Sequence, residues 1–342
     1  MNSHPLQTFY FRLKRKFIRF LYRNSPEIFM QGARLHMLCN MYSIIDLRTA
    51  PPPPERRIIS YMTEGTEFTG IADRLRSIVT AYVIARENNR KYFIYHDKDF
   101  KLYDYLEPAG EDWRIDEKEI CRGLNNVAFL WCLKTWPKLN PLRKEYHCYW
   151  ASSLIDLKVL PPGIQEKYTF SSAFWSLFKM SPRLELMVEN AMDAANLTEN
   201  NYVAVHLRFL NFFEAVEEHS TDLNGTASAD EQKAMLAAVN LTLRNIYSEY
   251  GMRIVLFADS NRFLEATHPD FCTILPGKVG HVLRHTHNES ITDKAFVDLM
   301  VISKAKAVIS ITGEGIYGGG FSMTAATIGH KPFIKVPLEK ES

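Results

Sequence analysis

"TGIADRLRSIVTAYVIARENNRKYFIYHD", residues 69–97, predicts a helix followed by a strand. The apolar side chains of its first half recur at helical spacing: Ile71, Leu75, Ile78, Val79, Tyr82 and Val83. The aromatic and β-branched run 91–96 is typical of a strand. With the apolar run "RRIISYMT" (56–63) before it, the stretch predicts a β-α-β unit, and therefore a parallel sheet with a right-handed crossover.

The glycines of this unit are not those of a dinucleotide-binding protein. Gly70 opens the helix, but the second and third glycines of G-x-G-x-x-G are missing. Asp73, Arg74 and Arg76 occupy the first turns instead. Because that motif needs its glycines to bring the backbone close to a pyrophosphate, a dehydrogenase is disfavoured.

The second half of the chain alternates between strand and helix patterns. Strands are expected at 202–209, 253–259, 306–312 and 331–336, and helices at 229–251, 293–305 and 321–329. In the less regular middle of the chain, helices are expected around 171–180 and 183–195. We therefore expect an α/β protein of two Rossmann-like domains, 55–195 and 196–342, facing a cleft, as in glycosyltransferases of the GT-B type. Residues 1–50 form a basic N-terminal segment and linker before the "PPPP" spacer.

The composition excludes several classes of protein. The net charge of +2 over 342 residues argues against a protein that coats nucleic acid. The five cysteines are scattered, with no C-x-x-C and no cluster with histidine, so neither a disulfide framework nor a structural zinc site is indicated. No metal site is predicted.

The N-terminal segment carries "FYFRLKRKFIRFLYRN" (9–24), in which basic residues alternate with aromatic and aliphatic ones. Such a helix can lie in an anionic membrane interface. It can equally pack its apolar side on the protein, and both interpretations remain open. Because the sequence shows neither a signal peptide nor an apolar run of membrane-spanning length, we expect a bacterial cytoplasmic protein. The first interpretation of the segment would make it peripheral on the inner face of the cytoplasmic membrane.

Polar residues follow two of the expected strands, where parallel sheets bind their ligands. His206 and Arg208 end the strand 202–209 and point to the same side of it. An arginine there can grip a phosphate with two donors or form a buried salt bridge. Asp259 ends the next strand, where its carboxylate can accept from ribose hydroxyls or cap the following helix.

A glycine-rich loop follows the strand 306–312 in "SITGEGIYGGGFSMTAATIGHKP" (310–332). The loop leads into a helix of small residues, with Ser322 and Thr324 in its first turns. Backbone amides and hydroxyls at such a position favour an anion. Glycines also make flexible surface loops, but the place of this one between a buried strand and a helix favours the anion site.

Together these motifs resemble the fucosyltransferases that use GDP-fucose, which include the bacterial nodulation and core α-1,6-fucosyltransferases and the protein O-fucosyltransferases. The resemblance covers about residues 65–98 and 202–333. The first helix, "VHLR" (205–208), "LFADS" (256–260), "FVDLMVISKAKAVIS" (296–310) and "GFSMTAATIG" (320–329) are similar to family motifs in order and rough spacing. The second arginine that often follows the first in the family is absent, because Phe209 stands there.

The resemblance implies roles for individual residues. Arg208 would grip the β-phosphate of GDP, while His206, Asp298 and Asp259 would contact the guanosine. The closing loop would hold the phosphates from the other side through Gly320, Phe321, Ser322 and Thr324. The helix beginning at Gly70 would face the cleft opposite GDP and hold the sugar or the acceptor.

The resemblance also implies metal-independent transfer of fucose with inversion, from GDP-fucose as the donor substrate and without a cofactor. A carboxylate would act as general base on the acceptor, with Glu214, Glu217 and Glu67 as candidates. The acceptor, a glycan or a protein hydroxyl, is not identified by the sequence. Two alternatives stay open: a transferase of the same architecture that uses another nucleotide sugar, and a nucleotide-binding protein without transferase activity.

Overall fold

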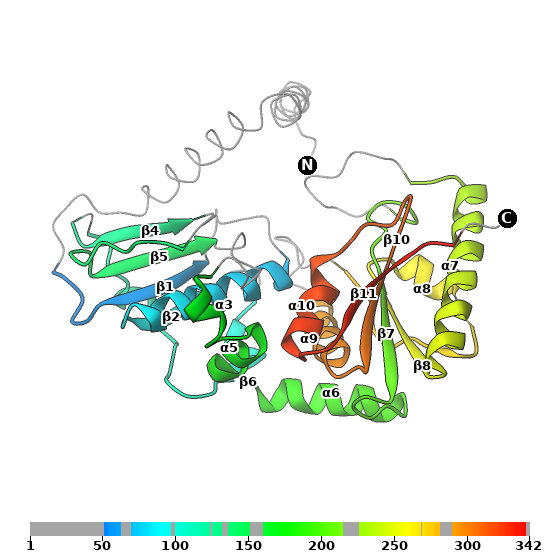
Figure 1. The fold of residues 1–342 in the computed structure, drawn as a ribbon, viewed down its shortest axis with the longest axis horizontal. Helices are drawn as coiled ribbons and strands as arrows, with labels where there is room; N and C mark the ends of the chain where they lie inside the picture. Colours follow the sequence, from blue (N-terminus) through cyan, green and yellow to red (C-terminus); the bar gives the residue numbers. More distant parts are fainter. Residues whose placement is uncertain are drawn as a thin grey trace, which may run out of the picture.

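The computed structural model describes residues 51–62, 70–96, 100–123, 125–131, 136–150, 160–214, 226–267, 269–280 and 289–339. Within these residues the chain forms two parallel β-sheets with helices packed on and between them (Figure 1). Residues 1–50, including the basic segment, and the candidate bases Glu67 and Glu217 lie outside the described residues. None of the described helices combines the length and apolarity that a membrane crossing requires.

The first sheet has the strand order β2-β1-β5-β4, with every neighbouring pair parallel. Its strands are β1 (Arg57–Met62), β2 (Lys91–His96), β4 (Val127–Trp131) and β5 (Glu145–Trp150). Helix α3 (Ile71–Glu87) connects β1 to β2, which confirms the β-α-β unit expected from the sequence. Asn88 caps the end of α3 and Asn89 takes a positive φ of 49°, a conformation that asparagine tolerates better than most residues.

The second sheet has the order β11-β10-β7-β8-β9 and is also parallel. Its strands are β7 (Tyr202–Leu207), β8 (Arg253–Ala258), β9 (Cys272–Thr273), β10 (Ala307–Thr312) and β11 (Phe333–Pro337). The helices between them are α7 (Ala229–Tyr250), α8 (Asn261–Ala266), α9 (Glu289–Ser303) and α10 (Gly320–Ile328). The expected α/β class, with strands alternating with helices, is confirmed.

The two faces of this second sheet contact different helices. Alternate residues of β7, Tyr202 and Ala204, share a hydrophobic cluster with α9 and α10. Val203 and Val205 lie on the opposite face in a second cluster with α7. Because side chains alternate along a strand, His206 is on the same face as Tyr202 and Ala204. The polar end of β7 therefore lies beneath α9 and α10.

Shorter elements connect the two sheets. They are η1 (Leu102–Asp104), β3 (Leu106–Pro108), η2 (Glu117–Glu119), α4 (Pro162–Gln165), α5 (Phe170–Leu177), β6 (Phe178–Met180) and α6 (Pro182–Ala194). The helix expected around 171–180 ends earlier, because residues 178–180 pair with β3 as an antiparallel ribbon. Helix α6 leads from β6 to β7 along the lower edge of the view (Figure 1). The proposed domain boundary near residue 195, at the end of α6, stays a prediction.

The halves are in close contact through helices α3, α5 and α10. The carbonyl oxygen of Ile328, at the end of α10, accepts hydrogen bonds from Ser171 Oγ (2.7 Å) and Trp175 Nε1 (3.1 Å) on α5. Tyr105 stacks on Phe296 of α9 with ring centroids 4.1 Å apart. One hydrophobic cluster accordingly contains side chains of both sheets.

The ends of helices α9 and α10 lie close together at Gly329, the residue that follows α10. A Cβ atom at position 329 would lie only 1.8 Å from the carbonyl oxygen of Ser303 at the end of α9. The neighbouring group is backbone, so it cannot turn away as a flexible side chain would. Glycine is therefore required here by close approach and not by a special φ angle, since Gly329 has an ordinary φ of −78°.

Candidate functional site

The candidate site begins with His206 and Arg208, at the carboxyl end of β7. His206 is buried, with 6% of its surface exposed. Burial, and then the positive charge of Arg208, lower the pKa of His206 to about 4, so the imidazole is neutral at pH 7. A Cβ atom on Gly319 would lie 3.2 Å from His206 Cε1 and 3.6 Å from Arg208 Cδ. The glycine-rich loop thus crosses directly beside this pair, as its glycines allow.

Helix α10 starts against the same pair. Its N-cap is Gly319, so no side chain caps the first turn, and the ring of Phe321 lies 5.9 Å from that of His206. Ser322 is completely buried, while Thr324 donates its hydroxyl hydrogen to the carbonyl oxygen of Gly320 at 2.8 Å. The Ser322 hydroxyl has no hydrogen-bond partner among the described residues, whereas that of Thr324 is used within the helix. Uncapped amides and the helix dipole favour an anion here.

Several buried polar atoms around this helix start have no hydrogen-bond partner among the described residues. They are His206 Nδ1, Ser310 Oγ, Ser322 Oγ and Arg76 Nε. Ser310 is the register partner of His206 across β10 and β7, so these two side chains lie side by side on one face of the sheet. Since buried polar groups are nearly always hydrogen-bonded in native proteins, this cluster indicates a site for a polar ligand.

Asp259 supports the loop that carries Arg208. Its two carboxylate oxygens accept the backbone N–H groups of Phe209 (2.8 Å) and Leu210 (3.0 Å). Burial raises the pKa of Asp259, an effect that these backbone hydrogen bonds oppose. The structure corrects the suggestion that Asp259 caps the next helix, because Ser260 is the N-cap of α8 and accepts from the N–H of Phe263. Asp259 instead orients the backbone that follows Arg208.

Asp298 lies on helix α9, where it forms a buried ion pair with Lys294. Burial raises the pKa of Asp298, although the charge of Lys294 opposes the shift. The ammonium of Lys294 lies 6.0 Å from the ring centroid of Phe257, and Phe257 is the register partner of His206 on β8. The ion pair is therefore on the same face of the sheet as His206. The partner was visible in the sequence as a lysine four residues before the aspartate.

Among the three candidate general bases, the structure describes only Glu214. Its Oε1 lies 3.4 Å from the backbone nitrogen of Arg262 in the first turn of α8. The side chain is partly exposed, and it follows the loop that Asp259 holds. Glu214 is therefore near the end of β7, in the segment that follows Arg208.

Arg76 is the residue that the sequence did not assign to the site. It lies in the second turn of α3, and a Cβ atom on Gly320 would lie 2.9 Å from its Nη2. Helix α3 belongs to the first sheet and α10 to the second, so this contact joins the two halves. The sequence showed an arginine near a helix start, but not that residues so far apart in the chain would meet.

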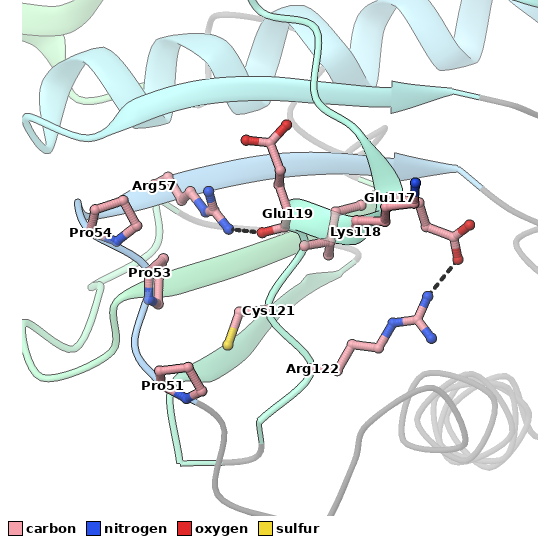
Figure 2. A pocket seen from close by; sticks show the side chains of 10 residues that line it. Pro51, Pro53, Pro54, Arg57, Glu117, Lys118, Glu119, Cys121 and Arg122 are labelled. Carbon is pink, nitrogen blue, oxygen red and sulfur yellow. Dashed lines mark hydrogen bonds and ion pairs between the residues drawn. The ribbon is translucent and has the colours of Figure 1, made fainter.

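A cavity of about 760 Å³ lies elsewhere, at the amino end of β1 (Figure 2). It is lined by Pro51, Pro53, Pro54 and Arg57, and by residues 117–122. Its arginines are already paired: Arg57 with Glu145 and the carbonyl oxygen of Glu119, and Arg122 with Glu117. Parallel α/β sheets bind ligands at the carboxyl ends of their strands, and this cavity is at the opposite end. None of the residues expected in the site lines it.

In the part of the chain that the structure describes, no three side chains of His, Cys, Asp or Glu gather as metal ligands would. The polar atoms around α10 are instead a neutral imidazole, two hydroxyls and two arginine side chains. Such a set is suited to an anionic ligand with several acceptor oxygens.

The fold is shared with known fucosyltransferase structures. The fucosyltransferase NodZ from Bradyrhizobium superposes with a TM-score of 0.50 at 13% identity, over 79% of this chain and 92% of NodZ. A NodZ α-1,6-fucosyltransferase co-crystallised with GDP gives a TM-score of 0.50 at 14% identity, over 79% and 91%. A mutant of Arabidopsis thaliana FUT1 in complex with GDP gives 0.52 at 10% identity, over 96% of this chain and 78% of FUT1.

These likenesses confirm the expected GT-B-type fold class and the resemblance to GDP-fucose-dependent fucosyltransferases. At identities this low they concern the fold alone. No family model matches the chain. No curated protein sequence matches it either.

Proposed function

We propose that this protein is a fucosyltransferase that moves fucose from GDP-fucose to a hydroxyl of a glycan or protein acceptor. The observation that carries the proposal is the cluster of unpaired buried polar atoms at the uncapped start of α10, beside Arg208. A nucleoside diphosphate offers the charge and the acceptor oxygens that this cluster needs. The shared fold supports the proposal, because two of the structures that superpose on this chain contain GDP.

In this proposal the diphosphate lies between Arg208 and the first turn of α10. Arg208 grips the β-phosphate. The backbone N–H groups of Phe321 and Ser322, together with the hydroxyl of Ser322, hold the diphosphate from the other side. The hydroxyl of Thr324 is instead bonded to the carbonyl oxygen of Gly320 at the start of the helix. The guanosine extends toward His206 and, one strand away, toward the ion pair of Asp298. Asp259 holds the Arg208 loop in place.

The proposed chemistry follows from the charge on the leaving group. When GDP departs, negative charge develops on the β-phosphate and the sugar gains oxocarbenium character. Fixed positive charge beside that phosphate stabilises the transition state more than the bound substrate. The acceptor hydroxyl attacks from the opposite face of the sugar, which inverts the anomeric carbon. Glu214, with Glu217 and Glu67 outside the described residues, is our candidate for the base that takes the hydroxyl proton.

One observation favours a second candidate function, transfer from another nucleotide sugar. Asp298, which would contact the guanine, is already paired with Lys294 inside the protein. A nucleobase that needs no carboxylate partner would leave this ion pair intact. The choice of donor therefore depends on whether the nucleobase of the donor displaces Lys294 from Asp298.

Nucleotides distinguish the two candidates directly. GDP and GDP-fucose are expected to stabilise the protein against heat, by about 2.7 kcal/mol at a hundredfold excess over Kd, because only the folded protein binds them. UDP is expected to have a much smaller effect, and a chelator to leave transfer largely unchanged. Thermal-shift assays across a set of nucleotide sugars measure the first effect. Preferential stabilisation by UDP-sugars would show that the donor is a UDP-sugar and not GDP-fucose.

We also propose that the basic segment 9–24 attaches the protein to the inner face of a bacterial cytoplasmic membrane. Each basic residue near an anionic surface contributes on the order of 1 kcal/mol, and salt weakens the attraction. Deleting residues 1–24 is expected to abolish sedimentation with anionic vesicles and leave transfer to a soluble acceptor unchanged. If the full chain ignores anionic vesicles at low salt and the deletion lowers the melting temperature, the segment packs on the protein instead.

A further inference from the structure

Arg76 reaches across the contact between the two halves of the molecule. It projects from the second turn of α3, and its side chain is 10% exposed. The guanidinium lies against the first residue of α10, since a Cβ atom on Gly320 would be 2.9 Å from Nη2 and 3.4 Å from Cζ. Any larger residue at position 320 would press on this group. The pairing of arginine with glycine keeps the guanidinium at the start of the helix.

The hydrogen bonds of Arg76 within the protein are incomplete. Its Nη2 pairs with the carboxylate of Asp73, one turn earlier on α3. Its Nε is buried and has no partner among the described residues. A guanidinium has five N–H donors, and leaving one of them buried without an acceptor is costly. The carboxylate of Asp73 holds the group in place, while Nε still needs an acceptor.

Arg76 and Arg208 approach the same short piece of backbone from different elements. A Cβ atom on Gly319 would lie 3.6 Å from Arg208 Cδ, and the next residue, Gly320, contacts Arg76. The α-carbons of Gly319 and Gly320 are about 3.8 Å apart, as in any trans peptide. The start of α10 is therefore flanked by one arginine from each half. His206 adds no charge here, since its imidazole is neutral.

We infer that Arg76 is the second cation of a diphosphate subsite and binds the phosphates of the nucleotide together with Arg208. The inference rests on the proposed function for the identity of the ligand. A nucleoside diphosphate carries more negative charge than the side chain of Arg208 balances. The guanidinium of Arg76, held in place by Asp73, supplies further fixed donors at the start of α10, including the unpaired Nε. The bound diphosphate then connects α3 of the first half with α10 of the second.

The inference predicts how strongly the protein distinguishes nucleotides by their phosphates. In the full chain, Arg76→Gln is expected to weaken GDP binding about 10- to 100-fold, as for loss of a hydrogen bond to a charged group. Guanosine, which has no phosphate, is expected to bind as it does to the wild type. Arg86→Gln is the matched control, because Arg86 is an exposed arginine in the last turn of the same helix. Calorimetric titration with GDP, GMP and guanosine measures all three proteins.

The outcomes separate this inference from the proposed function. If the wild type and both variants bind GDP equally well, Arg76 does not contact the phosphates. If Arg76→Gln weakens guanosine and GDP by the same factor, its role is only structural and the inference is also wrong. If the wild type binds no guanine nucleotide, the proposed function itself fails. Should Arg76→Gln not fold, Arg76→Lys replaces it: weaker GDP binding with unchanged guanosine binding supports the inference, and unchanged GDP binding overturns it.

Discussion

Replacing Arg208 by alanine is expected to lower the rate of sugar transfer about 10²- to 10³-fold while the protein stays folded. The reason is electrostatic: the guanidinium stabilises charge that develops on the leaving phosphate and is only partly present in the bound donor. Contacts that do not involve the side chain also hold the surrounding backbone. Its loop is held by Asp259, and the carbonyl oxygen of Arg208 accepts the N–H of Tyr317 at 2.8 Å.

The measurement is kcat/KM with GDP-fucose, alongside the melting temperature of the variant without ligand. Arg208→Lys is expected to restore only part of the rate, because an ammonium cannot make the two parallel donors of a guanidinium. Arg244→Ala is the control, since Arg244 is exposed on α7, on the other face of the sheet. Turnover near the wild-type value in folded Arg208→Ala would remove the main support for the site.

Gly329→Ala is expected to be the most damaging single change to the fold, with a loss of about 3 kcal/mol in the free energy of unfolding. The new methyl group would lie 1.8 Å from the carbonyl oxygen of Ser303, so α9 and α10 must separate. Both helices cover the face of the sheet that carries His206. Nucleotide binding is therefore expected to weaken along with stability.

Urea denaturation measures the stability change. Gly163→Ala is the control, because a Cβ atom there would meet nothing within 4 Å and the residue lies in the short helix α4. Alanine also favours a helix over glycine, so this control should be neutral or slightly stabilising. A Gly329→Ala protein within about 0.5 kcal/mol of the wild type would show that the helices separate at little cost.

The parallel sheets could be predicted from the sequence because their strands are buried. Runs such as residues 202–207 and 253–258 are largely apolar and contain β-branched residues, and the helices between them keep their apolar spacing. The ribbon of β3 and β6 could not be predicted. Each of these strands has only three residues, and their pairing depends on contacts between distant parts of the chain.

The site could be predicted only where one strand presents its residues together. His206 and Arg208 were found because a strand places alternate residues on one side. Asp259 had two interpretations: the helix cap is wrong, and the contact with the nucleoside stays a prediction. Its bonds to the N–H groups of Phe209 and Leu210 could not be predicted, because they depend on how the neighbouring strand ends. Arg76 was seen but not assigned, since no local pattern links α3 to Gly320.

The shared hydrophobic cluster has a consequence for how the molecule melts. Side chains of β1, such as Ile58, belong to the same cluster as Ala204 of β7 and Ala326 of α10. Neither half can lose its packing without exposing apolar surface of the other, which couples the two in a single cooperative unit. Two sheets therefore do not imply two independent melting transitions, and either half expressed alone would carry an uncovered apolar face.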